Sequence, residues 1–276
     1  MDLGLSNSTA VISGGSKGMG RAAAERLAAD GARVAILART KAAIDDTLAS
    51  LRSLGSPDAL GIVTDLTSRD DVDRAFAELG ERWPSLNILV NAAGPVDVGL
   101  KPIEELDDEE WVATFDIGTL SAVRCVRAAL PMLRRADWAR IVNLSAHSTK
   151  RQTPSLIAYT ASKAALTSVT KNLSLSLAPE GILVNTVSPG SFNSQGMRDY
   201  ITALPPDRGA DPDDLYDVMR IITEDFGHPA HLRRAGHPSE IGPVIAFLAS
   251  RTNSYMTGAN VNVDGGSDFD LRSDYD

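Results

Sequence analysis

The chain has 276 residues, a formal net charge of −9 and one cysteine, Cys125. This length suffices for one large α/β core. The acidic balance argues against nucleic-acid and membrane partners, because both need a concentrated positive field, and no apolar run is long enough to span a membrane. A single cysteine allows neither an internal disulfide framework nor a cysteine zinc site. We therefore expect a cytoplasmic protein without a metal.

Short β-branched runs alternate with alanine- and leucine-rich stretches of helical period. The expected strands are Thr9–Ser13, Arg33–Leu37, Ala59–Thr64, Asn87–Val90, Arg140–Leu144, Ile182–Val187 and Asn260–Val263. The expected early helices are Met19–Asp30, Lys41–Ser53 and Arg69–Leu79. Strands that alternate with helices form right-handed βαβ units. We predict one α/β domain over residues 1–276: a doubly wound Rossmann fold whose seven-stranded, mostly parallel sheet has helices on both faces.

The segment 192–238 interrupts this alternation with five prolines, several glycines and the acidic run that begins at Asp211. It follows the strand that ends at Val187, and ligands of open α/β sheets bind outside the carboxyl ends of the strands. We predict a substrate lid here; the alternative is a solvated loop with one short helix near residues 213–222. Its larger apolar side chains would either line a hydrophobic pocket or pack the lid on the body: Phe192, Met197, Tyr200, Leu204, Leu215, Tyr216, Met219 and Phe226.

A glycine-rich turn joins the first strand to the first helix, with the sequence Gly14-Gly15-Ser16-Lys17-Gly18-Met19-Gly20. Glycines at 14, 18 and 20 permit a turn tight enough for backbone N–H groups to contact a pyrophosphate. The helix N-terminus then adds a partial positive charge. A plain turn is the alternative, but the strand–turn–helix context favours a dinucleotide site.

The end of the second strand bears on the choice of nucleotide. An NAD site places an acidic residue there to accept the ribose 2′-OH, whereas this chain has Ala38 followed by Arg39. A guanidinium binds a 2′-phosphate with two charge-assisted hydrogen bonds, and Lys17 in the glycine turn supplies a second cation. Both are alternatively solvated surface charges. Their joint occurrence predicts that NADP(H) is preferred over NAD(H).

Two further turns are candidates for cofactor contacts. Asp65, followed by Leu66 after the third strand, either accepts a hydrogen bond from the adenine amino group or caps the next helix, a role for which Ser68 competes. The fourth strand ends in Asn91-Ala92-Ala93-Gly94, whose small residues let a ribose or a backbone approach closely.

Taken in order, these motifs resemble the short-chain dehydrogenases/reductases over nearly the whole chain. The resemblance extends to Tyr159-Thr-Ala-Ser-Lys163, Ser188-Pro189-Gly190, Arg234-Ala-Gly, Thr257-Gly258 and Asp264-Gly-Gly266, and looks closest to the 3-oxoacyl-carrier-protein reductase branch. It implies a nicotinamide-dependent enzyme that acts on a small carbonyl or alcohol substrate. By analogy with family members that pair through their fourth and fifth helices, it also implies a homotetramer.

The family's acid–base chemistry fits the spacing of Tyr159 and Lys163, which share one face of a helix at four residues apart. A cation one turn away stabilises a phenolate, and this would move the tyrosine towards the role of general acid/base. By resemblance, Tyr159 exchanges a proton with the substrate oxygen and Lys163 also holds the nicotinamide ribose. The alternative is an ordinary amphipathic helix with a surface lysine.

Two positions depart from the family pattern. The family serine, thirteen residues before the tyrosine, falls on Ala146, so Ser148 is the replacement candidate and Ser145 the second; His147 is another donor in that region. The family asparagine, seven residues after a tryptophan, falls on Gly118, which leaves room for water held by backbone carbonyls. Ser194 occupies the position of the hydroxyl that contacts the nicotinamide amide, after Pro189 and Gly190.

We therefore predict an NADP(H)-dependent carbonyl reductase or alcohol dehydrogenase with Tyr159 as general acid/base. A catalytically weak cofactor sensor or scaffold is the alternative, because Ala146 and Gly118 replace two family residues. A third possibility is dehydration or isomerisation on the same fold, which would leave the nicotinamide absorbance unchanged.

Overall fold

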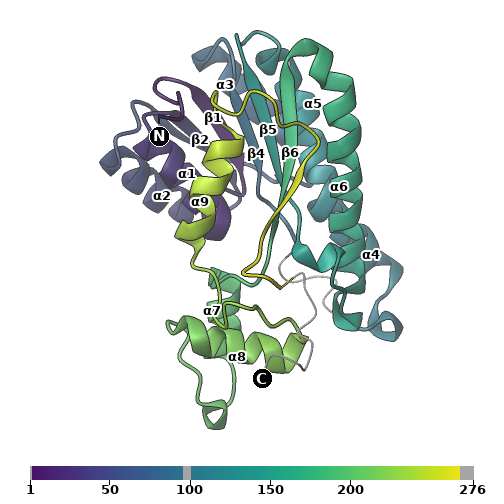
Figure 1. Ribbon diagram of the computed structural model, residues 1–276. Helices are drawn as coiled ribbons and strands as arrows, with labels where there is room; N and C mark the ends of the chain where they lie inside the picture. Colours follow the sequence, from purple (N-terminus) through teal and green to yellow (C-terminus); the bar gives the residue numbers. More distant parts are fainter. Residues whose placement is uncertain (1, 96–100, 268–276) are drawn as a thin grey trace.

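The structure, a computed structural model, describes residues 2–95 and 101–267. Its strands form one sheet in the order β3-β2-β1-β4-β5-β6-β7 (Figure 1). They are β1 (Thr9–Ser13), β2 (Arg33–Ala38), β3 (Ala59–Val63), β4 (Ile88–Asn91), β5 (Ala139–Leu144), β6 (Ile182–Pro189) and β7 (Asn260–Val263). The predicted doubly wound sheet is confirmed. All described strand pairs are parallel, because helical crossovers rather than hairpins connect them.

Helices cover both faces of the sheet, with α1, α2 and α9 on one and α3, α5 and α6 on the other. The α-helices are α1 (Gly18–Ala29), α2 (Lys41–Ser53), α3 (Arg69–Arg82), α4 (Asp108–Phe115), α5 (Ser121–Leu133), α6 (Ile157–Leu177), α7 (Gln195–Thr202), α8 (Leu215–Phe226) and α9 (Pro238–Leu248). A π-helical turn, Asp116–Leu120, joins α4 to α5. No helix among the described residues has the length and apolar character needed to cross a lipid bilayer.

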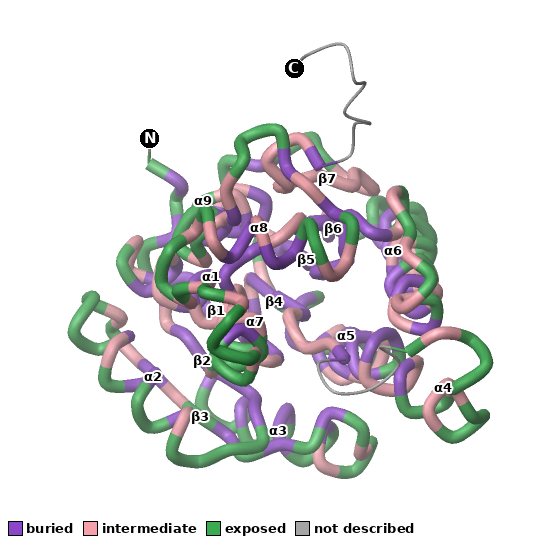
Figure 2. Tube along the Cα trace, turned by 90° about the horizontal axis from the view of Figure 1, so that it is seen from below, coloured by how far each residue is buried: buried purple, intermediate pink, exposed green. Residues whose placement is uncertain are grey.

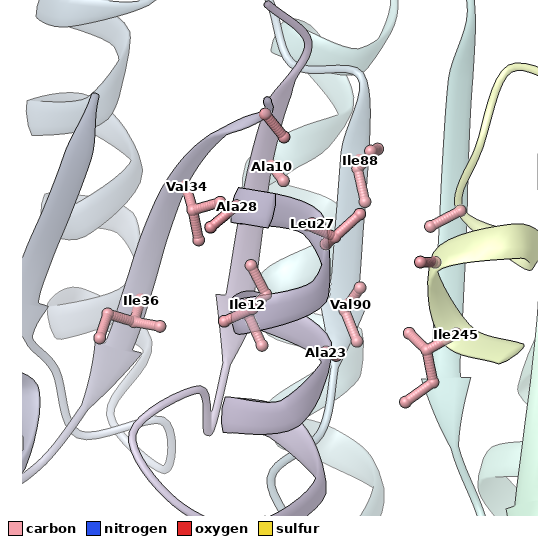
Figure 3. Packing of buried hydrophobic residues seen from close by; sticks show 14 of the residues in the cluster. Ala10, Ile12, Ala23, Leu27, Ala28, Val34, Ile36, Ile88, Val90 and Ile245 are labelled. Atoms are coloured by element: carbon pink, nitrogen blue, oxygen red, sulfur yellow. The ribbon is translucent and has the colours of Figure 1, made fainter. Parts of the chain in front are cut away.

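The strands are buried on both sides, so neighbouring residues of one strand enter different cores. Ala10 and Ile12 of β1 pack towards α1 and α9, whereas Val11 enters the cluster under α3 and α5. Figure 3 shows the first cluster, in which Leu27 of α1 and Ile245 of α9 meet the side chains of β1, β2 and β4. The near-continuous apolar runs of the sequence reflect this double burial.

The segment 192–238 is more regular than the sequence suggests. It contains two helices, α7 and α8, whereas the sequence predicts an irregular lid and the alternative is a solvated loop with one short helix; both helices lie beyond the end of β6 (Figure 1). Their apolar faces form a small cluster of their own, which includes Ile201, Val218, Met219 and Ile222 and is flanked by Met197, Leu204 and Leu215. Of the eight apolar candidates for a pocket lining, Met197, Leu204, Leu215 and Met219 thus pack the segment itself, and Phe192 belongs to the core of the sheet. Tyr200 and Tyr216 are exposed.

The sheet topology places a crevice at the carboxyl ends of the strands. The chain order reverses beside β1, which pairs with β2 on one side and with β4 on the other. The loops after β1 and β4 therefore leave the sheet in opposite directions and open a site for a ligand between them. Figure 2 looks onto this end, with buried strands at the centre and exposed residues along outer helices such as α2 and α4.

Candidate active site

The glycine turn after β1 packs directly on the end of β4. A Cβ atom on Gly14, where φ is +73°, would lie 2.7 Å from the Ala93 nitrogen, and one on Gly20 would lie 2.3 Å from the Gly14 carbonyl oxygen. Both positions therefore exclude any larger residue. Gly18, with φ of +54°, has open space where its Cβ would be. The turn thus brings backbone close to backbone and leaves its outer side, at Gly18, accessible to a ligand.

The N-terminus of α1 has the properties of an anion site. Lys17 is the N-cap residue and provides no side-chain capping bond, and no acidic residue stands in the first turn. By contrast, α3 is capped by Ser68 and α7 by Ser194. Uncapped N–H groups at the start of a twelve-residue helix, beside the exposed Lys17, fit a pyrophosphate. Of the other predicted residues here, Ser16 accepts a bond from Thr47 through its carbonyl and Met19 packs on the core.

The turns after β2 and β3 lie side by side at the next part of the crevice. Hydrogen bonds from the hydroxyl and N–H of Thr67 lower the pKa of Asp65, and Arg39 acts on it in the same direction. Arg39 is exposed and therefore accessible to a ligand. Ser68, not Asp65, caps α3 by accepting from the Asp71 nitrogen. Leu66 is buried beneath this turn.

Asn91 at the end of β4 belongs to a buried polar row. Its Oδ1 accepts from the Ser13 hydroxyl at 3.1 Å, and its Nδ2 donates to Asn143 Oδ1 at 2.8 Å. Asn143 in turn donates to the Thr170 hydroxyl on α6. The Asn91 side chain therefore bonds to both neighbouring strands, β1 and β5. The following residues, Ala92 to Gly94, present a backbone edge that is only partly buried.

Lys163, on α6, is buried against two of these strand ends. Its Nζ donates to the Leu144 carbonyl at 2.9 Å and to the Ala93 carbonyl at 3.5 Å. A Cβ on Gly94 would lie 3.0 Å from the same nitrogen, so Gly94 makes room for the ammonium group. Burial lowers the pKa of Lys163 to about 8. The ammonium is thus fixed at the carboxyl ends of β4 and β5, where the crevice lies.

Tyr159 precedes Lys163 by one turn of α6. Burial raises the pKa of its phenol to about 12, opposite to the lowering expected from a nearby cation. The physical cause is that burial removes solvation from the phenolate form, while the lysine nitrogen donates to the carbonyls of Ala93 and Leu144. Tyr159 is therefore a protonated phenol at neutral pH and able to donate.

The structure separates the two candidate serines. The Ser145 hydroxyl lies against α6, 2.9 Å from the Lys163 carbonyl and 2.9 Å from the Thr167 hydroxyl. It supports the helix that carries Tyr159. Ser148 lies in a short 3₁₀ turn after β5, is 2% exposed, and its hydroxyl has no hydrogen-bond partner among the described residues. A buried hydroxyl without a partner is costly, which marks Ser148 as the hydroxyl available to a substrate.

Ala146 and His147 lie between these serines. The methyl group of Ala146 is buried and supplies no donor. His147 Nδ1 lies 3.1 Å from the carbonyl oxygen of Pro189, and because that oxygen only accepts, Nδ1 carries the proton. The neutral ring then has an acceptor at Nε2. His147 is consequently unsuited to donate to a carbonyl unless the ring is charged.

The motif after β6 is packed against the last strand. A Cβ on Gly190 would lie 2.5 Å from the Asp264 Cα, so this position has no room for a side chain. The Gly190 nitrogen donates to the Val263 carbonyl at 2.9 Å. Ser194 accepts a bond from the Met197 nitrogen as the N-cap of α7, so this helix begins at the Ser194 hydroxyl.

Two residues near the site were missed by sequence reasoning. The Thr153 hydroxyl and His228 Nε2 lie within hydrogen-bond distance, although 75 positions separate them, and the His228 ring packs edge-on to His147. Neither residue belongs to a motif or to a periodic pattern. No signal in the sequence pointed to them, because only the packing of α8 brings them together.

The chain is similar to proteins of known activity over almost its whole length. A family profile described as enoyl-(acyl carrier protein) reductase matches residues 14–268. The short-chain reductase protein NovJ of Streptomyces niveus is 32% identical over 259 residues, which is 94% of this chain and 93% of NovJ.

Solved structures of reductases and dehydrogenases are also similar to this chain. L-Sorbose reductase from Gluconobacter frateurii, in complex with NADPH and L-sorbose, has a TM-score of 0.90 at 27% identity and covers 98% of this chain and 100% of its own. NAD⁺-bound xylitol dehydrogenase has a TM-score of 0.83 at 27% identity and covers 95% and 99%.

The parallel seven-stranded sheet agrees with these comparisons. Named relatives are reductases and dehydrogenases, and the protein is an oxidoreductase of the same type. The comparisons do not single out the 3-oxoacyl-carrier-protein reductase branch. This chain belongs to the short-chain dehydrogenase/reductase family.

Proposed function

We propose that the protein is an NADP(H)-dependent carbonyl reductase or alcohol dehydrogenase in which Tyr159 exchanges the proton. The observation that carries this proposal is the fixed position of Lys163 at the Leu144 and Ala93 carbonyls, one helical turn from a protonated Tyr159. When bound, a nicotinamide supplies the hydride that the carbonyl carbon accepts. Tyr159 donates its phenolic proton to the carbonyl oxygen, so that an alcohol forms. The Lys163 ammonium then stabilises the remaining phenolate.

Ser148 is proposed to polarise the carbonyl in place of the family serine. Its hydroxyl is buried and lacks a partner among the described residues, whereas Ser145 is committed to α6 and Ala146 has no donor. A hydroxyl that is already desolvated donates to a developing oxyanion at little reorganisation cost. Ser194, at the start of the lid helix α7, is the proposed contact for the nicotinamide amide.

The proposed preference for NADP(H) rests on residues of this chain, since relatives of both kinds exist. The end of β2 offers Ala38 instead of a carboxylate, and the exposed Arg39 and Lys17 flank the position of a 2′-phosphate. Two exposed cations at adjacent turns suit a ligand group that brings two negative charges. The uncapped start of α1 would hold the pyrophosphate.

The experiment that tests this function combines cofactor titration with turnover. Purified protein is titrated with NADPH and NADH and assayed against ketones, hydroxyketones and 3-oxoacyl thioesters, with Tyr159→Phe as the paired variant. We expect tighter NADPH binding and turnover that disappears in Tyr159→Phe while binding persists. Turnover that survives in Tyr159→Phe would overturn the proposed role of the phenol.

A second candidate, a cofactor-binding sensor or scaffold, is favoured by Ala146 and Gly118. It predicts NADPH binding without turnover on any carbonyl. Dehydration or isomerisation instead predicts substrate conversion with no change in nicotinamide absorbance, so the same assay separates the three possibilities.

We also propose a cytoplasmic homotetramer with a lid over residues 192–238. Helices α4 and α6 and the turn before α5 carry exposed apolar side chains that suit an interface between copies: Val112, Leu120, Ile157 and Leu175. Size-exclusion chromatography with light scattering tests the assembly. A monomer at micromolar concentration would contradict it.

A further inference from the structure

The end of the lid helix α8 is bonded to the segment that leads from Ser148 to Tyr159. The Thr153 hydroxyl lies 3.0 Å from the Phe226 carbonyl oxygen and 2.5 Å from His228 Nε2. A threonine hydroxyl has one proton, and the carbonyl can only accept it. His228 Nε2 therefore carries a proton and donates to Thr153, which leaves Nδ1 of the neutral ring as an acceptor.

The His228 ring continues this connection to the end of β6. Its centroid is 5.0 Å from that of His147 at an interplanar angle of 76°, an edge-to-face contact, and both side chains are buried. His147 in turn donates to the Pro189 carbonyl. Thr153, His228 and His147 thus form a continuous chain of contacts from the end of α8 to the end of β6. We call these three residues the latch.

The surroundings of His228 favour the neutral form of its imidazole. Burial, followed by repulsion from His147 and Arg151 of the facing segment, lowers the pKa of His228 to about 4. Asp225, the last carboxylate of α8, accepts from Arg208 at 2.9 Å and from the Tyr200 hydroxyl at 2.8 Å. Across the contact, Thr153 contributes no charge. Protonation of His228 would place a positive charge in a buried contact that has no carboxylate partner among the described residues.

We propose that Thr153 and His228 are positioning residues, which hold the segment 147–159 against the lid so that Ser148 and Tyr159 present their hydroxyls together. The effect on kcat that this inference predicts rests on the proposed function, because it requires turnover of a carbonyl substrate. Thr153 lies between Ser148 and Tyr159 in the chain, so its bonds to α8 restrict the segment that carries both hydroxyls. Acid opens the latch, because a charged His228 is expelled from its contact with His147.

The first test compares Thr153→Val with Thr153→Ser. Valine keeps the shape but loses both bonds, whereas serine keeps the hydroxyl. Thr223→Val is the matched control, because the Thr223 hydroxyl on α8 makes only a local bond to the Met219 carbonyl. We expect Thr153→Val to lower kcat about ten- to hundredfold with an unchanged Kd for NADPH, and the other two variants to retain wild-type kcat. Equal kcat in all four proteins, with turnover in the wild type, would overturn the proposal.

The second test needs no turnover. Hydrogen–deuterium exchange is measured on peptides that span residues 147–158 and 223–230 at pH 7, after thermal melting has shown that each variant folds. Thr153→Val is expected to exchange faster in both peptides than wild type and Thr153→Ser, while peptides from β1 and α1 are unchanged. If neither peptide exchanges faster in Thr153→Val, the latch is refuted, whether or not the wild type is active. If both peptides exchange faster but the wild type has no activity, only the proposed function is refuted.

The pH profile separates positioning from simple packing. Glutamine at position 228 retains an N–H donor for Thr153 but does not titrate. We expect wild-type kcat to fall below about pH 5, and His228→Gln to retain most of its neutral activity without that acid limb. An acid limb that is the same in both proteins would show that His228 is not the titrating group of the latch.

Discussion

A Cβ atom on Gly118 would lie 2.4 Å from the hydroxyl oxygen of Ser162 and 2.9 Å from its Cβ. Gly118 lies in the π-helical turn between α4 and α5, and Ser162 lies on α6 between Tyr159 and Lys163. The Ser162 hydroxyl is held by the Tyr159 carbonyl at 2.8 Å, and the neighbouring Thr119 hydroxyl donates to the Ser162 carbonyl at 2.7 Å. The absence of an asparagine at position 118 thus has a steric reason: the helix that carries the catalytic pair occupies the space.

Gly118→Ala is expected to destabilise the protein, because the turn must move away from α6 to accommodate the methyl group. We expect a loss of about 1–3 kcal/mol in the free energy of unfolding, the usual cost of overpacking. Ser162→Ala removes the shorter contact but keeps the second, so the double variant should recover part of that loss. Denaturant unfolding of the four proteins measures the coupling. Additive losses would show that Ser162 is not the obstacle.

Ser148→Ala is expected to lower kcat about 10²-fold without weakening NADPH binding, because one donor to the developing oxyanion is lost. Ala146→Ser places a hydroxyl at the family position, and adding it to Ser148→Ala should restore about tenfold. Steady-state kinetics on the best substrate provide the measurement. Ser145→Ala is the control, since its hydroxyl bonds α6. Full activity in Ser148→Ala would exclude Ser148 as the polarising donor.

Lys163→Met is expected to abolish turnover and to stabilise the fold at neutral pH. Burial lowers the pKa of Lys163 from its usual 10.5 to about 8, so the folded protein disfavours the charged form. The folded state has its full stability above pH 10.5, where Lys163 is neutral in both the folded and the unfolded protein. Part of that stability is lost as the pH falls through 8. At pH 7 the charged lysine therefore costs up to about 3 kcal/mol, because a tenfold change in proton affinity corresponds to about 1.4 kcal/mol.

The measurement for Lys163→Met is denaturant unfolding from pH 7 to pH 10. The stability advantage of the variant should be largest at pH 7 and should shrink as the pH rises above 8. Bonds from Nζ to the carbonyls of Leu144 and Ala93 offset part of the cost, so an advantage of about 1–3 kcal/mol is expected. A variant that is less stable than wild type at pH 7 would contradict this account of the burial.

Arg39→Ala is expected to weaken NADPH binding about 10- to 100-fold and to leave NADH binding within about threefold, because only the 2′-phosphate meets the guanidinium. Ala38→Asp adds a carboxylate that repels the phosphate and accepts from a ribose hydroxyl, so it should shift the preference towards NADH. Fluorescence titration of both nucleotides measures the ratio. Equal weakening of NADPH and NADH in Arg39→Ala would show that Arg39 supports the turn rather than the phosphate.

His228 predicts a loss of stability in mild acid. Its pKa is about 4 in the fold against 6.5 for an ordinary histidine, so the neutral form is favoured. The associated stability is fully present above pH 6.5 and is lost as the pH falls to 4, by up to about 3 kcal/mol. Unfolding of wild type and His228→Gln between pH 7 and pH 4 measures it. Parallel curves for the two proteins would contradict the assignment.

Sequence by itself determined the features that depend on neighbours within a few residues. The alternation of strands and helices, the glycine turn after β1 and the four-residue spacing of Tyr159 and Lys163 are local patterns, because helix and strand periodicity are properties of a short window. The main correction at this level, two helices in residues 192–238, arose where prolines and glycines obscured the helical period.

Only the tertiary structure decided which polar groups meet. It turned Ser145 towards α6 and left Ser148 without a partner among the described residues, set the pKa of Lys163 by burying it under two carbonyls, and joined Thr153 to His228. These outcomes depend on distances between residues far apart in the chain and on the water that packing removes. These distances and this desolvation cannot be predicted from the local residue pattern, since both arise only when the helices and the sheet are packed together.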